Sequence, residues 1–137
     1  MSTSLKDTLK RHEGFRSKPY RCTAGKLTIG YGRNLDDVGV SMEEADYLLD
    51  HDIAKAETAL YAALPWAKEL DQNRKDVLIN MTFNMGVSSL LTFKNTLSLI
   101  QAKRYEEAAK NMMLSKWAMQ VGSRAVELAR IMETGEL

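Results

Sequence analysis

The chain has 137 residues, of which 45% are hydrophobic and 27% are charged. These proportions are typical of a globular protein, so composition argues against a disordered chain and against a membrane protein. Nineteen basic and eighteen acidic residues leave a net charge of +1, and we therefore expect no nucleic-acid partner. A single domain of this length buries about two thirds of the surface that its unfolded chain exposes, so we expect a stable fold without disulfides or metal.

The sequence contains neither an apolar run of roughly 18 residues, as a membrane span needs, nor a signal-peptide core near its start. We therefore expect that the protein is synthesised in a cytoplasm and that it does not associate stably with a membrane. The one cysteine, Cys22, cannot form an intramolecular disulfide, which agrees with a reducing compartment.

The first predicted element is a helix that ends at about Glu13. Ser4 is followed three residues later by an acidic residue, a pattern found at helix starts. Leu5 and Leu9 recur at helical spacing, and Gly14 is a suitable C-terminal stop.

A β-hairpin is predicted next, with strands over 15–22 and 27–32 and a turn over 23–26. In the second strand, the apolar residues alternate with Thr28, Gly30 and Gly32. One face of this strand is therefore apolar, whereas the other carries a hydroxyl among positions without side chains and leaves room for a ligand.

The rest of the chain is predicted to be helical. Ser41 and Glu44 form a capping box, and apolar residues then recur every three or four positions until Pro65, which predicts one helix of about 22 residues. Asp71 begins a second helix that Gly86 stops. Further periodic stretches cover about 93–101, 105–114 and 123–132.

These elements predict an α+β fold within a single domain, 1–137. A small β-hairpin lobe would cover about 14–55, and a helical lobe would contain about 1–13 and 56–137. The long helix would join the two lobes, and we expect a cleft between the hairpin and the helical bundle.

Glu13 is the strongest candidate for chemistry. It lies four residues after Leu9, which predicts a place on the buried face of the first helix, at the negative end of the helix dipole. Both surroundings would raise the pKa of its carboxyl group, as a general acid requires. The alternative is a helix-terminal carboxylate that turns outward or pairs with an arginine.

The motifs HEGF at 12–15 and PYRCTAGKLTIGYG at 19–32 resemble the active-site region of the phage-type lysozymes, glycoside hydrolase family 24. Further similar segments follow in order: INMTFNMG at 79–86, FKNTL at 93–97, RYEEAAKNM at 104–112, SKW at 115–117 and SRA at 123–125. The resemblance spans nearly the whole chain and implies a two-lobed, lysozyme-like fold. Between Gly32 and Ser41 the chain is shorter than the longest-known members.

The family pattern is a Glu-Gly pair, eight residues, an aspartate, five residues and a threonine. By this resemblance Glu13 is the proton donor, and Thr28 positions the attacking water. Cys22 stands in the place of the aspartate. It would act as a thiolate in that role, or the enzyme would work more weakly through the other two residues, or activity would be lost. We favour the first two interpretations over the third, and over a small buried side chain.

Other positions follow from the same resemblance. Four residues are expected to line the saccharide cleft: Asn34, Phe83, Thr96 and Asn111. Phe83 as a core residue and Asn111 as a solvated helix position are the alternatives. Arg124 would pair with Glu13 and lower the pKa of its carboxyl group. Trp117 is expected in the core, and we expect neither a metal nor a cofactor.

The resemblance implies a lysozyme that hydrolyses the β-1,4 bond between N-acetylmuramic acid and N-acetylglucosamine in peptidoglycan, with inversion. It implies a monomer that a phage or prophage uses for host-cell lysis. The enzyme would stay in the host cytoplasm until a separate membrane-permeabilising protein, a holin, releases it to the wall. Two alternatives remain open: a lytic transglycosylase, and a catalytically silent peptidoglycan-binding protein.

Overall fold

The computed structural model describes residues 3–137, which form two compact units, one that extends to Leu48 and one over Leu49–Leu137. We call them the N-terminal unit and the helical unit and describe each by itself. The boundary between them falls inside one helix, α2, which spans Met42–Ala63. The assignment of residues 1–13 to the helical lobe stays a prediction.

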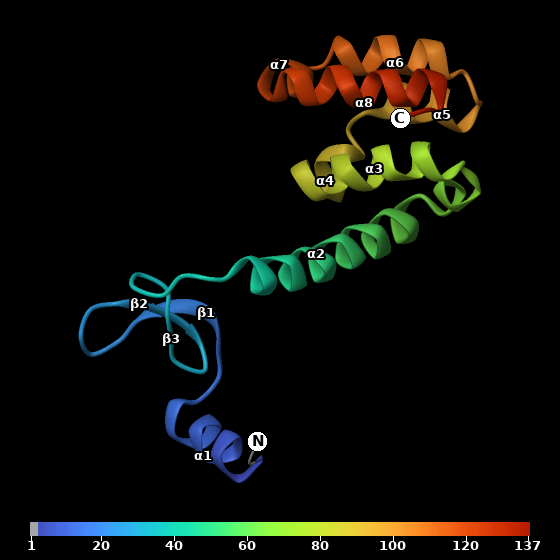
Figure 1. The fold of residues 1–137 in the computed structure, drawn as a ribbon. Coiled ribbons are helices and arrows are strands. Elements are labelled where there is room, and N and C mark those ends of the chain that lie inside the picture. The colour runs from blue at the N-terminus through green and yellow to red at the C-terminus, as the bar shows by residue number, and fades with distance from the viewer. Residues whose placement is uncertain (1–2) are drawn as a thin grey trace. The chain divides into compact units, whose positions relative to one another are not determined.

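The N-terminal unit begins with one helix, α1, and continues with a three-stranded antiparallel sheet in the order β1-β2-β3 (Figure 1). The elements are α1 (Thr3–Glu13), β1 (Arg16–Arg21), β2 (Leu27–Gly30) and β3 (Arg33–Asn34). In the sheet, Thr28 of β2 lies opposite Tyr20 on one side and Asn34 on the other. The central strand therefore places Thr28 between two neighbours.

The predicted hairpin is confirmed, with two differences. The second strand ends at Gly30 rather than Gly32, because both glycines have positive φ angles, 68° and 79°, that interrupt the extended backbone. The third strand has only two residues and was not predicted, since so short a segment carries no alternation of apolar and polar residues.

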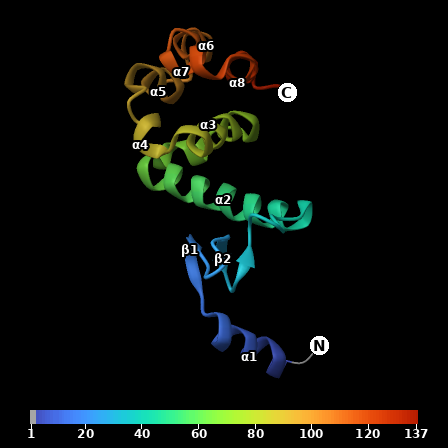
Figure 2. The ribbon, with the colours of Figure 1, turned by 90° about the vertical axis from the view of Figure 1, so that its left-hand side faces the viewer.

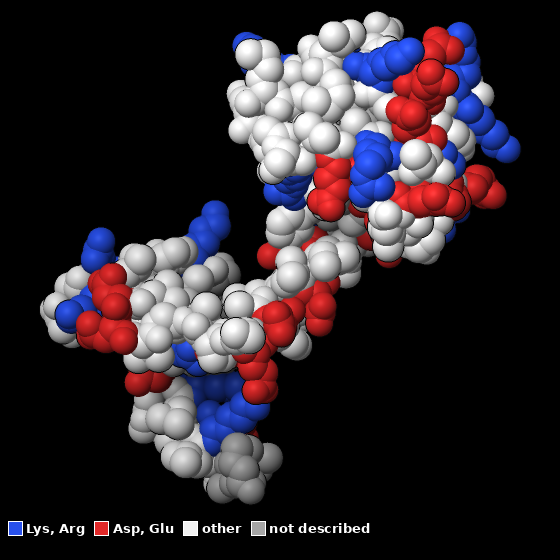
Figure 3. Space-filling view, turned by 45° about the horizontal axis from the view of Figure 1, so that its top comes forward, with Lys and Arg blue, Asp and Glu red and all other residues white. Residues whose placement is uncertain are grey.

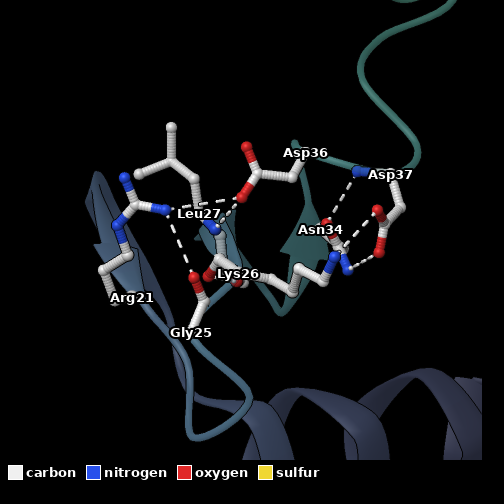
Figure 4. A network of polar contacts seen from close by, with 8 residues as sticks. Arg21, Gly25, Lys26, Leu27, Asn34, Asp36 and Asp37 are labelled. Carbon is white, nitrogen blue, oxygen red and sulfur yellow. Dashed lines mark hydrogen bonds and ion pairs between the residues drawn. The ribbon is translucent and has the colours of Figure 1, made fainter.

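Polar contacts hold the loops of this sheet together (Figure 4). The carboxylate of Asp36 accepts a hydrogen bond from the Leu27 backbone N–H at 2.7 Å, and Arg21 donates to the Gly25 carbonyl at 3.2 Å. Thr28 is the only buried side chain among residues 4–48. Hydrogen bonds and ion pairs, rather than an apolar core, therefore define the N-terminal unit.

The helix α2 starts at the predicted capping box. The Glu44 backbone N–H donates to Ser41 Oγ at 3.1 Å, and the Glu44 carboxylate accepts from the Ser41 backbone N–H at 2.8 Å. The same carboxylate pairs with Arg33, and chiefly this hydrogen bond lowers the pKa of Glu44 to about 2. Acidic side chains continue along α2 (Figure 3).

The helical unit contains the rest of α2 and seven further elements: η1 (Pro65–Glu69), α3 (Gln72–Met85), α4 (Val87–Leu90), α5 (Lys94–Gln101), α6 (Tyr105–Met113), α7 (Lys116–Val121) and α8 (Ser123–Thr134). Helix α6 packs against α5 and α8, and α8 also contacts α3 and α7 (Figures 1 and 2). Asp71 caps α3 and Gly86 ends it, as predicted. The short elements η1, α4 and α7 were not predicted, because they are too brief for a helical period to show.

Every buried hydrophobic residue of the described chain belongs to this unit. The most enclosed large side chains are Leu60, Leu78, Met81, Leu90, Ile100, Met112, Met132 and Val77. Arg74 joins α3 to α8 by donating to the Met132 carbonyl at 2.6 Å while its guanidinium stacks on Tyr105. The predicted α+β class is thus confirmed, with the apolar core in the helices.

Within residues 3–137, no helix combines the length and the apolar character that crossing a bilayer requires.

Candidate active site

Glu13 is the last residue of α1, and its carboxylate lies against Gly32 at the end of the sheet's second turn. A Cβ atom at Gly32 would stand 2.6 Å from Glu13 Oε2, which is closer than real Cβ contacts allow. The absence of a side chain at Gly32 therefore permits this position of the carboxylate. The last glycine of the Thr-Ile-Gly-x-Gly segment, Gly32, thus lies in contact with the candidate acid Glu13 within one unit.

The prediction that Glu13 has apolar surroundings is wrong within the N-terminal unit. Glu13 itself is exposed, and the two leucines on the apolar stripe of α1, Leu5 and Leu9, are 59% and 47% exposed. The reason is that the sheet of residues 16–34 contributes no buried hydrophobic side chain against which this stripe packs.

Cys22 occupies a tight turn directly after β1. Its backbone N–H donates to the Lys26 carbonyl at 2.9 Å, and its own carbonyl accepts from the Gly25 N–H at 2.8 Å. Thr28 Oγ1 donates to the same Lys26 carbonyl at 2.9 Å. The turn thus brings Cys22 and Thr28 together at the Lys26 carbonyl.

The surroundings of Cys22 lower the pKa of its thiol. Hydrogen bonds from the backbone of Lys26 and then of Ala24 stabilise the thiolate most, and the Thr28 side chain adds a smaller contribution against a partial desolvation. A larger fraction of Cys22 is therefore ionised near neutral pH than for an ordinary cysteine. This is the direction that a cysteine in the place of an aspartate needs.

The face of β2 that carries Thr28 is less open than predicted. Thr28 is only 4% exposed, because it lies in the central strand and its hydroxyl turns back to the Lys26 carbonyl. At Gly30 a Cβ atom would meet nothing within 4 Å, whereas at Gly32 it would meet Glu13. Open space is therefore found at Gly30 rather than along the whole strand.

Asn34, predicted to bind saccharide, is engaged in the loop after β3 (Figure 4). Its side-chain nitrogen donates to Asp37 Oδ2 at 3.0 Å, and its oxygen accepts from the Asp37 backbone N–H at 2.9 Å. Both ends of the amide thus support the loop, and its role toward a sugar stays a prediction.

Phe83 and Arg124 line one cavity of the helical unit, which we call the Phe83 cavity. Its volume is about 430 Å³, and its other lining residues are Leu49, Ile53, Glu57, Asp76, Ile79 and Asn80. Phe83 is 45% exposed and is therefore not a core residue. Arg124 donates twice to Asn80 Oδ1, at 3.1 and 2.7 Å, and its pairing with Glu13 stays a prediction.

Thr96 and Asn111 line a second cavity of the helical unit, of about 340 Å³, which we call the Thr96 pocket. Its other lining residues are Thr92, Phe93, Lys94, Asn95, Ser115, Lys116 and Trp117. Trp117 is buried, as expected, and yet it also borders this pocket. The two lysines were not among the sequence candidates, because nothing in the local pattern separates them from other exposed lysines.

In the described part of the chain, no group of three or more histidine, cysteine, aspartate or glutamate side chains is placed to hold a metal ion.

Comparison with known proteins identifies the family. A family model described as phage lysozyme matches residues 10–131. The chain is 33% identical to "probable T4-type lysozyme 1" of Dictyostelium discoideum, over 100% of this chain and 98% of that protein. It is 33% identical to an endolysin of Acyrthosiphon pisum secondary endosymbiont phage 1, over 80% and 74% of the two chains, and 30% identical to the endolysin of Salmonella phage P22, over 80% and 79%.

The first of these alignments extends over 166 positions, so that relative contains residues that this chain of 137 lacks. The family match begins just before Glu13 and runs through the Cys22 turn, Gly32 and both cavities of the helical unit. The chain therefore belongs to the phage lysozyme family of glycoside hydrolases, and its substrate is peptidoglycan.

Proposed function

We propose that this lysozyme hydrolyses the β-1,4 bond between N-acetylmuramic acid and N-acetylglucosamine, with Glu13 as the proton donor. The observation that carries the proposal is the contact of the Glu13 carboxylate with Gly32. This contact places the only carboxylate of the Glu-Gly motif beside the segment that contains Thr28. Donor and water-positioning residue thus belong to one continuous piece of structure.

In the proposed reaction Glu13 transfers its proton to the glycosidic oxygen while the bond to the anomeric carbon breaks. A water molecule attacks the opposite face of that carbon, so the configuration at the carbon inverts, and the water transfers a proton to the Cys22 thiolate. Thr28 orients the water, and the Cys22 thiolate takes the place of the second carboxylate. The lowered pKa of Cys22 supports this assignment.

Saccharide binding is assigned to Asn34 of the N-terminal unit and to Phe83, Thr96 and Asn111 of the helical unit. The Phe83 cavity combines apolar walls with the amide of Asn80 and with charged side chains, and the Thr96 pocket combines two aromatic side chains with amides and hydroxyls. Amides and hydroxyls beside apolar walls suit N-acetylated sugars. Arg124 is assigned as the partner of Glu13.

We also propose that the enzyme acts as a monomer in host-cell lysis by a phage or prophage. In this role it accumulates in the host cytoplasm without stable membrane association, and a holin gives it access to the wall. The names of the two phage endolysins support this role.

Mass spectrometry of the muropeptides released from purified peptidoglycan tests the proposal. The wild-type enzyme should release products with reducing-end muramic acid, and Glu13→Gln should reduce their formation by at least about 100-fold. Glu43→Gln is the matched control, because Glu43 is an exposed glutamate in the same unit, outside the site. Its product formation should equal that of the wild type.

Other products would replace the proposal. Release of 1,6-anhydromuramic acid would identify a lytic transglycosylase, which needs one acid/base carboxylate and admits no water. Binding to peptidoglycan without any Glu13-dependent product would identify a catalytically silent binding protein.

The role of Cys22 has its own test, the dependence of kcat/KM on pH. If the thiolate works, activity is present above the Cys22 pKa and falls as the thiol becomes protonated at lower pH. In Cys22→Asp this acidic limb should move to lower pH, because an aspartate ionises near pH 4. Cys22→Ser, which cannot ionise in this range, should be the least active of the three, and equal profiles for all three proteins would contradict the assignment.

A further inference from the structure

The turn over residues 22–26 connects β1 to β2 and carries Cys22. The residues on either side of it, Arg21 and Leu27, lie opposite each other as the last pair of the β1–β2 ladder. Inside the turn, the Cys22 backbone makes the two hydrogen bonds described above. The place of the Cys22 side chain therefore depends on what keeps Arg21 and Leu27 together.

Asp36 contacts both of these residues (Figure 4). Its Oδ2 atom accepts from the Leu27 backbone N–H at 2.7 Å and from Arg21 Nη1 at 3.5 Å. Arg21 Nη1 also donates to the Gly25 carbonyl, inside the turn, at 3.2 Å. A hydrogen bond to a carboxylate is about twice as strong as one between neutral groups, so the contact with Leu27 is the principal one. One carboxylate oxygen thus joins the residue before the turn to the residue after it.

The loop that presents Asp36 is itself held in place. The Val38 N–H donates to the Asn34 carbonyl at 3.0 Å, which forms a helix-like turn directly after β3. The Leu35 N–H donates to the Leu27 carbonyl at 2.7 Å. Asp36 therefore stands on an ordered loop that is bonded to the sheet, and its carboxylate does not have to be fixed by the contacts with the turn alone.

The charges around the turn are balanced by the same loop. Arg21 pairs with Asp36 at 3.5 Å, and Lys26 pairs with Asp37 at 3.3 Å. The lowered pKa of the Cys22 thiol agrees with this balance, because its causes are chiefly backbone hydrogen bonds inside the turn, and no charged side chain of the described residues is among them. The shape of the turn, rather than a neighbouring charge, therefore decides the state of the thiol.

We propose that Asp36 is a positioning residue for the hydrolysis: by joining Leu27 to Arg21, it holds the turn in the shape that places the Cys22 side chain for its step. This inference rests on the role proposed above for Cys22. Asp36 contacts neither the sugar nor the water in this scheme and acts only through the turn. It lies outside the Glu-Gly and Thr-Ile-Gly-x-Gly motifs, which explains why the sequence did not indicate it.

The first experiment measures the thiol without any substrate. Cys22 is the only cysteine of the chain, so its rate of alkylation by iodoacetamide reports on this side chain alone. The dependence of that rate on pH gives the pKa of the thiol, because the thiolate is the nucleophile. In Asp36→Ala the turn should loosen and its backbone hydrogen bonds to the thiolate weaken, so the pKa of Cys22 should rise.

The direction of this shift separates the shape of the turn from a simple effect of charge. Loss of the Asp36 charge, by itself, would favour the thiolate and lower the pKa of Cys22. Asp36→Asn loses the charge but keeps an oxygen that accepts from Leu27, so the pKa of Cys22 should not rise in this variant. Asp46→Ala is the matched control, because Asp46 is an exposed aspartate of α2 in the same unit, and it should leave the alkylation profile unchanged.

The second experiment measures hydrolysis of peptidoglycan by the same variants. Each is compared at the plateau of its pH profile, so that a loss reports the place of the thiolate rather than its amount. Asp36→Ala should reduce kcat by about three- to tenfold and leave KM unchanged, because a misplaced group slows the chemical step without weakening binding. Asp36→Asn should retain most of the wild-type kcat, and Asp46→Ala should retain all of it.

Circular dichroism at the assay temperature establishes that each variant is folded, and recovery in Asp36→Asn guards against a loss that comes from unfolding. An alkylation profile of Asp36→Ala that matches the wild type, an equal rise of the pKa in Asp36→Asn, or an unchanged kcat in Asp36→Ala would overturn the inference.

Failure of the proposed function is recognised by a different variant. If Cys22→Ser keeps the kcat of the wild type, the thiol takes no part in the reaction, and the inference falls together with that role. If Cys22→Ser is impaired, Asp36→Ala should cost less in the Cys22→Ser protein than in the wild type, since no thiolate is left to position. Equal costs in the two backgrounds would show that Asp36 does not act through Cys22 and would overturn the inference alone.

Discussion

The two units of this lysozyme are built in different ways. The helical unit contains every buried hydrophobic residue that the structure describes, and it surrounds side chains such as Leu78, Ile100 and Met112 completely. The N-terminal unit has one buried side chain among residues 4–48, that of Thr28, and its loops are held by Asp36, Asp37 and their partners. Hydrophobic burial therefore stabilises one unit, and directional polar contacts shape the other.

The residues proposed for the chemical step lie in the lightly packed unit. Glu13, Cys22 and Thr28 are positioned by a helix end, a tight turn and a short strand, and each depends on one or two specific contacts. A hydrogen-bonded turn positions a thiol or carboxylate through directional contacts and needs no large core. We therefore expect that mutations in the core of the helical unit mainly lower stability, whereas mutations at the chemical residues of the N-terminal unit mainly lower activity.

The largest effect on stability is expected for Ile100→Ala in the helical unit. Ile100 is fully buried, so its truncation should lower the free energy of unfolding by about 2–5 kcal/mol. Ile29→Ala in β2 removes the same atoms from a half-buried position and should lower it by about 1 kcal/mol. Urea unfolding followed by circular dichroism measures both, and similar losses would show that the N-terminal unit has a comparable core.

A smaller effect is expected when a polar contact of the N-terminal unit is removed. Asp36→Ala deprives the Leu27 backbone N–H of its acceptor and should lower the free energy of unfolding by about 1 kcal/mol. Asp36→Asn keeps an oxygen in the same place and should recover most of this loss. If Asp36→Ala and Asp36→Asn are equally unstable, the charge of Asp36 rather than its hydrogen bond matters.

The smallest and most condition-dependent effect concerns Glu44. Its pKa in the folded chain is about 2, below the ordinary value of 4.5, so its ion pair with Arg33 stabilises the fold above pH 4.5 and loses this effect as the pH falls to 2. Glu44→Gln should therefore melt at a lower temperature than the wild type at pH 7, and the difference should disappear toward pH 2. A difference that is constant with pH would contradict an ionic origin.

Much of the helical architecture follows from the sequence, because its signals are local. The capping box at Ser41 and Glu44, the cap at Asp71 and the stop at Gly86 each act through neighbouring residues, and all three are confirmed. The two-residue strand β3 and the four-residue helix α4 were missed, since their partners determine them more than their own residues do.

The candidate site was less predictable for the same reason. The helical period of Leu5 and Leu9 correctly indicates a stripe on α1, yet it does not show whether anything covers that stripe. Similarly, the alternation in β2 places Thr28 on a face but does not show that its hydroxyl donates to the Lys26 carbonyl. The contact between Glu13 and Gly32 joins residues that are distant in sequence, and only the family motif connected them beforehand.

The most direct test of the account compares kcat for peptidoglycan hydrolysis in Gly32→Ala and Gly39→Ala. Both glycines have positive φ angles, 79° and 64°, so both substitutions strain the backbone, but only at Gly32 does the added Cβ meet the Glu13 carboxylate. At Gly39 the nearest atom is the Leu35 carbonyl oxygen at 4.0 Å. The two variants are compared at the same fraction of folded protein. Because the added Cβ displaces the Glu13 carboxylate, kcat of Gly32→Ala should be at least about tenfold lower than kcat of Gly39→Ala. Equal kcat values in the two variants would contradict the claim that the position of Glu13 against Gly32 supports catalysis.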